Sequence, residues 1–488
     1  MPGCARSRSD VPMSRKLVLV VIDGLTPTML ETSLGTSATP TLTALAEAGT
    51  LGRATTTFPS LTPVCLSSIA TGAHPDVHEI PHLVWWHRGE RRLVEYGSSF
   101  GAARAAGLGR TLRDTLVGMN SDHLGRGAVT LFEALADAGL RTAAVNFNAY
   151  RGRTRHRPTV PFLEPVLGPE RFFFYNLFQS ERTGAPLSFR NRAAGSIDSY
   201  AAAVGRWLVN RDGFDFLLFY LSDYDYASHA AGPDAADAVL ERCDDAIGGL
   251  VRAAGGIEEF LARYAVIVMS DHGQTAVTRV ARLGDRFRNE PDTLVTASNR
   301  AAHVYRIGPE APSARALAER LDAEPAAEVV LFAEDGATVA RRAGAELRIL
   351  DGGALEGDPS ILDQPDAVAR ATAAVRCPNA GEVVVSAVEG WEFEDLGGRH
   401  HRGGGSHGSL VAGDSLVPVI AVGMEGMATP SSIVDIAPAV LAHFGVGAPA
   451  YAARAGLGRA QSPHGRTTAP CPGDRRRARA GRDGVRPP

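Results

Sequence analysis

The sequence has no apolar run that could cross a membrane. Its most hydrophobic stretch, LVLVVI at residues 17–22, is six residues long, whereas a spanning helix needs about 20 residues. The stretch is also too short for the core of a secretory signal, and residues 1–16 contain no apolar segment. We therefore expect no membrane segment and no targeting segment. Met13, just before the apolar stretch, is an alternative start to Met1.

Cysteine is scarce, and its spacing fits neither a disulfide framework nor a thiolate metal site. The five cysteines, Cys4, Cys65, Cys243, Cys377 and Cys471, are scattered and odd in number, without a CxxC pair. Unpaired thiols of this kind are typical of proteins in a reducing compartment. We therefore expect a cytoplasmic protein.

The sequence also has no large excess of positive or negative charge. The formal net charge is −4 at pH 7; the seven Arg and two Asp of residues 461–488 contribute +5, which leaves −9 for residues 1–460. A mildly acidic body argues against a protein that coats nucleic acid. We expect a small-molecule substrate and no nucleic-acid polymer as partner. Nothing in the sequence indicates an oligomeric state.

Buried strands alternate with amphipathic helices along most of the chain. Apolar strands are predicted at residues 17–22, 214–221 and 264–269, and each runs directly into acidic residues. Continuous apolar runs rich in β-branched residues are typical of strands buried on both faces. Because helical patterns separate these strands, the sequence predicts an α/β fold, a doubly wound, mostly parallel sheet with helices on both faces.

Two kinds of region depart from this alternation. Residues 275–398 have shorter strands and longer loops, which predicts an inserted, smaller α+β subdomain. The catalytic core would then comprise residues 14–274 and 399–450. Residues 1–13 and the Arg/Gly/Pro-rich tail at 455–488 lack apolar periodicity, so we expect both to be disordered extensions.

Residues that can bind metal lie where the predicted strands end. Asp23 follows the first strand, where open α/β sheets place their ligands, although an Asp-Gly pair alone is more often a turn. Asp225 and His229 are four residues apart, so on a helix both face the same side. A carboxylate and an imidazole in this arrangement suit a divalent metal, and a surface capping pair is the alternative.

Two further segments add histidines. Asp271 and His272 adjoin in MSDHG, where the following glycine permits the chain to leave regular geometry. The glycine-rich segment GGRHHRGGGSHGSL carries His400, His401 and His407; by itself it would be an exposed loop. Together with the acids above, these side chains supply the mixed oxygen and nitrogen ligands that zinc-like metals prefer.

The order of these motifs resembles that of a known family. VVIDG, TPVCLSSIATG, DYASH, MSDHG and GSHGS are similar to motifs of the alkaline phosphatase superfamily, most closely its branch of type I phosphodiesterases and nucleotide pyrophosphatases. The resemblance covers residues 15–450 approximately. It implies an alkaline phosphatase-like fold and a metal-dependent phosphoric ester hydrolase, a phosphodiesterase or nucleotide pyrophosphatase. A phosphonate hydrolase, a phosphomonoesterase and a binding protein without turnover are the alternatives on the same scaffold.

The resemblance also implies a catalytic centre with two divalent metal ions, for which zinc is expected and manganese is an alternative. The family's nucleophile lies ten residues before the glycine of TG, which points to Thr62. Two such ions roughly 4 Å apart can clamp both the attacking and the leaving oxygen, and metal coordination lowers the pKa of a threonine hydroxyl. The implied ligands are Asp225, His229 and His407 for one ion, and Asp23, Thr62, Asp271 and His272 for the other.

Neighbours of Thr62 have other expected roles. Thr57 lies five residues too early to be the nucleophile, and we expect it to be a strand residue. We expect Cys65 to be a residue of the hydrophobic core that lies on a helix. A sulfatase is disfavoured because Thr62 is neither Cys nor Ser and no Arg follows in TPVCL.

The segment after this helix departs from the family. Nucleotide pyrophosphatases usually show HGIVGN there, whose Asn donates to a phosphate oxygen, but this chain reads HEIPHL at residues 78–83. No Asn stands at the expected place, and Glu79 replaces the glycine. We therefore consider His82 a candidate substrate-binding residue, with a packed loop histidine as the alternative.

Overall fold

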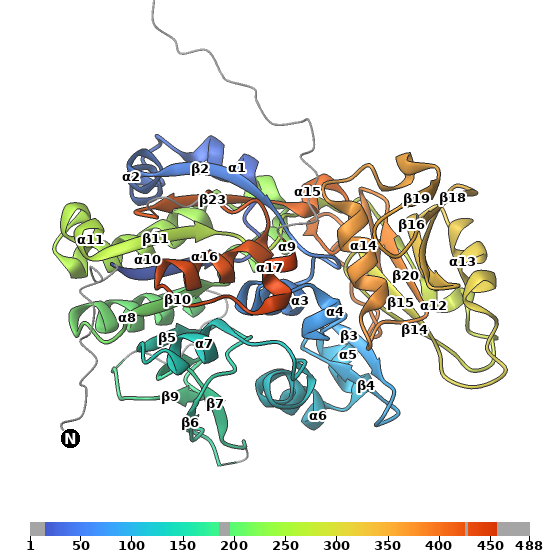
Figure 1. Ribbon diagram of the computed structural model, residues 1–488, viewed down its shortest axis with the longest axis horizontal. Helices are drawn as coiled ribbons and strands as arrows, with labels where there is room; N and C mark the ends of the chain where they lie inside the picture. The colour runs from blue at the N-terminus through green and yellow to red at the C-terminus, as the bar shows by residue number, and fades with distance from the viewer. Residues whose placement is uncertain (1–14, 162, 185–195, 425–427, 456–488) are drawn as a thin grey trace, which may run out of the picture.

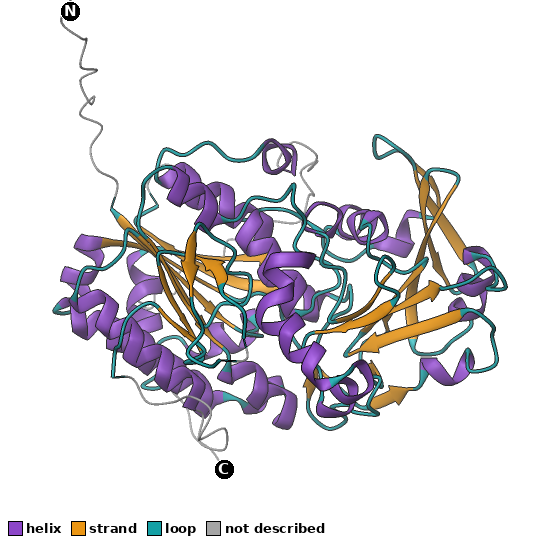
Figure 2. Cartoon of the chain, turned by 90° about the horizontal axis from the view of Figure 1, so that it is seen from below, coloured by secondary structure: helices purple, strands orange, loops and turns teal. Residues whose placement is uncertain are grey.

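The computed structural model describes residues 15–161, 163–184, 196–424 and 428–455 (Figure 1). The extensions predicted at residues 1–13 and 455–488 lie outside this range, apart from residue 455. Two sheets dominate the described part, a larger one in the core and a smaller one at one end of the molecule (Figure 2). No helix among the described residues is both long and apolar enough to cross a membrane.

The core sheet has eight strands. They are β1 (Lys16–Ile22), β2 (Thr50–Thr55), β5 (Thr142–Val145), β8 (Arg171–Phe174), β9 (Phe178–Gln179), β10 (Phe216–Leu221), β11 (Tyr264–Met269) and β23 (Leu416–Val422). Their order is β2, β23, β11, β1, β10, β5, β8, β9. The five consecutive strands from β11 to β8 run parallel. Strand β23 runs antiparallel to both β11 and β2, and β9 runs antiparallel to β8.

Helices cover both faces of this sheet, as the apolar sequence of β1 requires. Leu17, Leu19 and Val21 point to one face and pack with residues of α3, α7 and α16, while the residues between them pack with α2, α8 and α10 on the other. This is the doubly wound α/β fold that the sequence predicts. These helices are α2 (Pro40–Ala48), α3 (Thr62–Thr71), α7 (Leu131–Asp137), α8 (Ser196–Asn210), α10 (Asp237–Ala254) and α16 (Ile436–His443).

The second sheet is the core of the inserted α+β subdomain. Its strands are β14 (Thr293–Ser298), β15 (Ala301–Arg306), β16 (Ala327–Glu334), β17 (Ala337–Arg342), β18 (Ala345–Ile349), β19 (Leu355–Gly357) and β20 (Val383–Ala387). They pair antiparallel in the order β14, β15, β20, β16, β17, β18, β19. Helix α13 (Ala314–Asp322) packs on one face and α14 (Ala367–Arg376) on the other. The second face also contacts Phe58 and Leu410 of the core, so the two units share a hydrophobic cluster.

Short strand pairs tie the ends of the insertion together. β12 (Thr275–Ala276) pairs with β22 (Gly405–Ser406), and β13 (Arg279–Ala281) pairs with β21 (Trp391–Phe393). Two further pairs, β3 (Val84–His87) with β4 (Arg92–Glu95) and β6 (Thr154–His156) with β7 (Val166–Gly168), lie outside the main sheets. The remaining helices include α1 (Pro27–Ser33), α4 (Pro75–His78), α5 (Phe100–Ala106), α6 (Leu108–Arg113), α9 (Asp223–Ala231), α11 (Ile257–Arg263), α12 (Leu283–Arg286), α15 (Ala412–Ser415) and α17 (Ala450–Ala455).

The three cysteines within the described ranges are buried free thiols. They are Cys65, Cys243 and Cys377. Cys65 lies in the core on α3, as predicted. This finding agrees with the expectation that these cysteines form no disulfide framework.

Candidate active site

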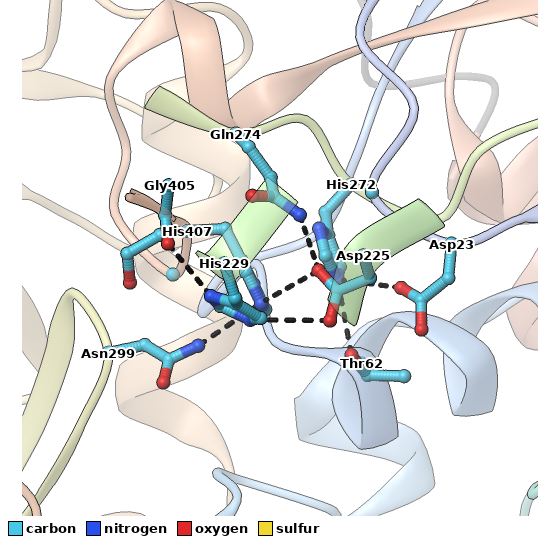
Figure 3. A network of polar contacts seen from close by, with 12 residues as sticks. Asp23, Thr62, Asp225, His229, His272, Gln274, Asn299, Gly405 and His407 are labelled. Carbon is cyan, nitrogen blue, oxygen red and sulfur yellow. Dashed lines mark hydrogen bonds and ion pairs between the residues drawn. The ribbon is translucent and has the colours of Figure 1, made fainter. Parts of the chain in front are cut away.

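The candidate site lies at the carboxyl ends of three neighbouring parallel strands. Asp23 directly follows β1, and Asp271 lies two residues after the end of β11. Helix α9 begins two residues after β10 and carries Asp225 and His229 on the same side, with Nε2 of the histidine 3.2 Å from Oδ2 of the carboxylate. Parallel strands bring their carboxyl ends to one edge of the sheet, which is why acids far apart in sequence meet here (Figure 3).

Thr62 stands at the first position of α3, next to this edge. Pro63 follows it, and proline at a helix start has the backbone torsion that the helix needs. The hydroxyl oxygen of Thr62 lies 3.2 Å from Nε2 of His272. The amino end of α3 also presents the positive end of the helix dipole, which suits a phosphoryl group.

Thr57 is not a strand residue, so that expectation is wrong. β2 ends at Thr55, and Thr57 lies in the connection to α3, where its hydroxyl is 2.9 Å from Nδ1 of His74. The connection leaves the sheet before Thr57 because it must cross to the site and start α3. Thr57 therefore packs against the core rather than pairing in the sheet.

Three histidines of the site are oriented by backbone carbonyl groups. A carbonyl oxygen can only accept a hydrogen bond, so Nδ1 of each neutral ring carries the proton and Nε2 presents its lone pair to the site. Histidines that bind metal are commonly oriented in this way. The Nδ1–O distances are 2.8 Å from His229 to Gly405, 3.0 Å from His272 to Gly273, and 2.7 Å from His407 to Ser60.

The ligand atoms form two overlapping groups. Atoms of Asp225, His272 and His407 lie within 4.8 Å of one another, and so do atoms of Asp23, Asp271 and His272. The rings of His272 and His407 stack with their centroids 3.6 Å apart, and His272 thus belongs to both groups. Of the four ligands implied for the second ion, Asp23, Asp271 and His272 form one of these groups, and Thr62 lies 3.2 Å from His272. Of the three implied for the first ion, Asp225 and His407 are in the other group, and His229 contacts Asp225.

Buried carboxylate oxygens show that this donor set fits a cation. Oδ1 of Asp23 and Oδ2 of Asp271 accept no hydrogen bond from any residue that the structure describes. They lie 3.3 and 3.4 Å from Nε2 of His272, so three electron-rich atoms converge in a buried place. Burial, together with the charge of Asp225, raises the pKa of Asp23 well above its ordinary value, and burial beside Asp23 does the same for Asp271. A divalent ion would remove this penalty.

Asp225 lies in a more positive environment than the other two acids. Burial opposes its charged form, but attraction by His229 and His407 more than offsets burial and lowers its pKa. Burial likewise works against charge on His229, yet Asp225 raises the pKa of that imidazole to about 9. Carboxylate and imidazole donors in near-equal number are the set that zinc accepts, and manganese can also use it.

Two supporting residues were not found by the sequence analysis. Gln274, directly after MSDHG, donates from Nε2 to Oδ1 of Asp225, and Tyr220 of β10 donates to Oδ2 of Asp23. Gly24 has φ +71°, and a Cβ atom there would overlap Nε2 of Gln274. The glycine after Asp23 therefore leaves room for this amide. A glutamine beside a motif carries no signal of its own, because only the fold brings it to Asp225.

The glycine of MSDHG has a different role from the expected one. The φ angle of Gly273 lies outside the left-handed region, so the residue does not supply an unusual torsion. Instead, a Cβ atom at Gly273 would overlap the backbone oxygen of Gly413. The glycine is required because two loops approach closely behind Asp271 and His272.

A pocket of about 400 Å³ opens over the converging donor residues. Its walls come from the loop after β4, from the ends of β5 and β10, from the tip of the β14–β15 hairpin and from the loop before β22. Asn299 and Arg399, in the last two segments, were not predicted to be part of the site. The lining includes Thr62, Tyr96, Phe100, Asn148, Tyr175, Asp225, Tyr226, His229, Asn299, Arg399, His401 and His407.

His82 does not line this pocket, which corrects its interpretation as a substrate-binding residue. The side chain is fully buried. Its Nδ1 lies 2.8 Å from the oxygen and 3.1 Å from the nitrogen of Val84, and its Nε2 lies 3.2 Å from the oxygen of Ala301. The structure therefore shows the packed loop histidine, because both ring nitrogens face backbone groups between β3 and the insertion.

The two other histidines of the glycine-rich loop differ from each other. His401 stacks on His229 with ring centroids 4.0 Å apart, and its Nδ1 lies 2.6 Å from Oε1 of Glu392. His400 is exposed. His401 thus contacts the site through His229, although it belongs to neither group of converging ligand atoms.

Comparisons with known proteins agree with this geometry. Residues 17–410 match the family model described as type I phosphodiesterase / nucleotide pyrophosphatase. No curated protein matches the sequence significantly. The solved structure of phosphonoacetate hydrolase from Sinorhizobium meliloti 1021 with phosphonoacetate is similar, with 18% identity, a TM-score of 0.60, and coverage of 88% of this chain and 96% of that chain.

Murine ectonucleotide pyrophosphatase / phosphodiesterase 5 has a similar structure too. It shows 15% identity and a TM-score of 0.59, and the match covers 89% of this chain and 96% of that chain. An inactive variant of the same murine protein in complex with AMP matches with 16% identity, a TM-score of 0.58 and the same coverage. At this level of identity the likeness shows a shared fold.

Proposed function

The chain belongs to the type I phosphodiesterase / nucleotide pyrophosphatase family, and from this premise we propose that it is a phosphodiesterase or nucleotide pyrophosphatase with Thr62 as nucleophile and two divalent metal ions. Hydrolysis of phosphoric esters is the chemistry of the family. The observation that carries the finer proposal is the position of the Thr62 hydroxyl, 3.2 Å from Nε2 of His272 and at the pocket. In this position the hydroxyl can reach a phosphoryl group bound between α3 and the metal-ligating side chains.

The converging donor atoms support the residues that we propose as metal ligands. When bound, two divalent ions would lower the pKa of the nucleophile and neutralise charge on the phosphoryl group. Zinc is our proposal for both sites because imidazole and carboxylate donors are mixed. The proposed ligands are Asp225, His229 and His407 for one ion, and Asp23, Thr62, Asp271 and His272 for the other.

Residues of this chain would orient the substrate and carry out the displacement at phosphorus. The hydroxyl of Thr62 loses its proton to solvent and its oxygen attacks phosphorus. The bond from phosphorus to the leaving oxygen breaks, that oxygen takes up a proton from solvent, and a phosphothreonine forms. Water then hydrolyses that ester and restores the hydroxyl. The amino end of α3 faces the charge of the phosphoryl group throughout. Nδ1–carbonyl hydrogen bonds hold His229, His272 and His407 in one orientation, so their ring nitrogens need not reorganise.

A diester is the preferred substrate class in this proposal. A monoester carries a second negative charge, and enzymes that prefer it usually place a third metal or an Arg beside the nucleophile. Among the described residues, the donor atoms converge in two groups only, and no Arg immediately follows Thr62. Arg399 does line the pocket, so a substrate with a second phosphate, such as a pyrophosphate, is compatible with this site.

The second candidate is a phosphonate hydrolase on the same scaffold. The observation that favours it is the structural similarity to phosphonoacetate hydrolase. The two candidates share the proposed metal ligands and differ in the bond that is broken. Only turnover of defined substrates separates them.

The test is a substrate screen of the metal-reconstituted protein. We expect kcat/KM for bis(p-nitrophenyl) phosphate to exceed that for p-nitrophenyl phosphate and for phosphonoacetate. The Thr62→Ala variant serves as the control for contaminating phosphatases, because it should keep the fold and lose turnover. A preference for phosphonoacetate would favour the second candidate, and no turnover of any of these compounds would refute the proposal.

A further inference from the structure

The tip of the β14–β15 hairpin brings a residue of the inserted subdomain into the candidate active site. Asn299 occupies this tip with φ +57°, a left-handed conformation that Asn adopts more readily than most residues. Its side chain is 8% exposed and lines the pocket. Figure 3 shows Asn299 next to His407, from which it is separated by more than a hundred positions in sequence.

The backbone around Asn299 is fixed on both sides. The carbonyl of Asn299 accepts from the N–H of Phe393 at 2.7 Å, and the N–H of Arg300 donates to the carbonyl of His407 at 2.9 Å. The guanidinium of Arg300 is fully buried and forms an ion pair with Asp414 at 2.9 Å. The hairpin tip is therefore attached to the same loop that carries His407, and Asn299 has little freedom to move away from the site.

The amide of Asn299 donates to the lone pair of His407 that a metal ion would need. Nδ2 of Asn299 lies 3.1 Å from Nε2 of His407. Because Nδ1 of His407 faces the carbonyl of Ser60 at 2.7 Å, Nε2 is the unprotonated nitrogen and accepts from the amide. The hydroxyl of Ser298, 3.3 Å from Oδ1, is consistent with this orientation of the amide. Metal binding and this hydrogen bond therefore exclude each other.

We propose that Asn299 contacts the substrate and that its amide donates to a non-bridging oxygen of the bound phosphoryl group once His407 holds a metal ion. When a metal ion binds Nε2 of His407, the amide of Asn299 loses its acceptor. An unpaired donor is unfavourable in a buried pocket. The phosphoryl oxygens are the acceptors that enter this pocket. The inference rests on the proposed function and adds a specificity-determining residue to it.

The proposal also accounts for a missing residue. The segment HEIPHL after α3 has no Asn at the place where one would donate to a phosphate oxygen, and His82 is packed away from the pocket. Asn299 offers the same chemical group from the tip of the β14–β15 hairpin. A neutral amide matches the single negative charge that a phosphodiester spreads over two oxygens, so the residue would favour diesters.

Binding without turnover gives the test. In the metal-loaded Thr62→Ala protein, calorimetry would measure the affinities for bis(p-nitrophenyl) phosphate and for inorganic phosphate. Adding Asn299→Ala should weaken diester binding about 10- to 100-fold, the range for a hydrogen bond to a charged group, with metal content unchanged by elemental analysis. Asn289→Ala, at an exposed position of the same subdomain, is the matched control and should leave both affinities unchanged.

Asn299→Asp is a second variant with the same volume. It replaces the donor with a carboxylate, so it should weaken binding of the diester at least as much as Asn299→Ala while it preserves packing. Unchanged diester affinity in both variants, or loss of a metal ion from Asn299→Ala, would overturn this inference and leave the proposed function standing. If the metal-loaded Thr62→Ala parent binds neither ligand, the proposed function fails, and the inference fails with it.

Discussion

The hydroxyl oxygen of Thr62 lies 3.2 Å from Nε2 of His272, although the two residues are 210 positions apart in sequence. Thr62 begins helix α3, and His272 follows strand β11. Because His272 belongs to both groups of converging donor atoms, the hydroxyl is a neighbour of both.

Thr62→Ala should reduce turnover of a phosphodiester by roughly a thousandfold or more, because it removes the proposed nucleophile. Thr62→Ser should retain part of the activity. The matched control is Thr57→Ala, which removes a hydroxyl that contacts His74 and should lower the free energy of unfolding by about 1 kcal/mol without a comparable loss of activity. Steady-state kinetics and denaturant unfolding measure both. Greater loss of activity in Thr57→Ala would contradict the assignment.

His407→Ala should lose one metal ion per chain and most of the activity. The side chain is buried and its Nε2 lies 3.7 Å from Oδ1 of Asp225, so the substitution removes a donor atom beside that carboxylate. His401→Ala should have a smaller effect, through its stacking on His229, and exposed His400→Ala the smallest. Elemental analysis after reconstitution with zinc, together with kinetics, would rank the three. Equal losses would mean that another histidine of this loop is the ligand.

Gly24→Ala should weaken metal binding and lower stability. Its φ of +71° strains any side chain, and a Cβ atom would also press on Gln274, which holds Asp225. Gly35→Ala is a matched control because Gly35 has φ +79° but no heavy atom within 4 Å of its Cβ position. Both variants should lose about 1–2 kcal/mol of stability from backbone strain, and only Gly24→Ala should lose zinc affinity in a competition titration. Equal zinc affinities would show that Gln274 does not support Asp225.

His82→Gln should change stability and its pH dependence rather than substrate affinity. Burial lowers the pKa of His82 to about 4, from an ordinary value of 6.5. Between these values the unfolded chain binds a proton that the native protein does not, so stability falls as pH decreases from 6.5 towards 4. Each such histidine contributes a slope of up to about 1.4 kcal/mol per pH unit.

Urea unfolding of the metal-loaded protein at pH 7 and pH 5 would measure this slope, which should be smaller in His82→Gln than in the wild type. His123, with a pKa lowered to about 4 mainly by burial, should preserve the remaining slope in both proteins. KM for a diester should stay within a few fold. A large increase in KM at unchanged stability would restore His82 as a substrate-binding residue.

The sequence predicted the part of the site that local patterns encode. Apolar runs that end in acids located Asp23 and Asp271 at strand ends, and four-residue spacing placed Asp225 and His229 on one face of a helix. Strand order then explains why these segments meet, since β11, β1 and β10 are neighbours. The doubly wound sheet and the insertion follow from the same periodic signals.

The remaining parts depend on tertiary contacts that no local pattern records. Asn299 lies at the tip of a hairpin in the insertion, and nothing in the letters SNR shows that the tip reaches His407. Likewise, nothing in the local sequence distinguishes Gln274 and Arg399 from other polar residues, because only the fold brings them to the site. His82 illustrates the opposite error: its position in the chain suggested a substrate contact, but both of its ring nitrogens face backbone groups. The position of His82 in the chain therefore did not show in which direction its side chain points.

The pairing of β12 with β22 has an evolutionary consequence. Thr275 pairs with Ser406, so the segments through which the chain enters and leaves the insertion are held side by side, three residues after His272 and directly before His407. Surface loops between these segments can vary in length and sequence while this pairing keeps His272 and His407 in place. Because the same segment delivers Asn299, exchange of the insertion between related chains offers a route to new substrate preference with an inherited catalytic apparatus.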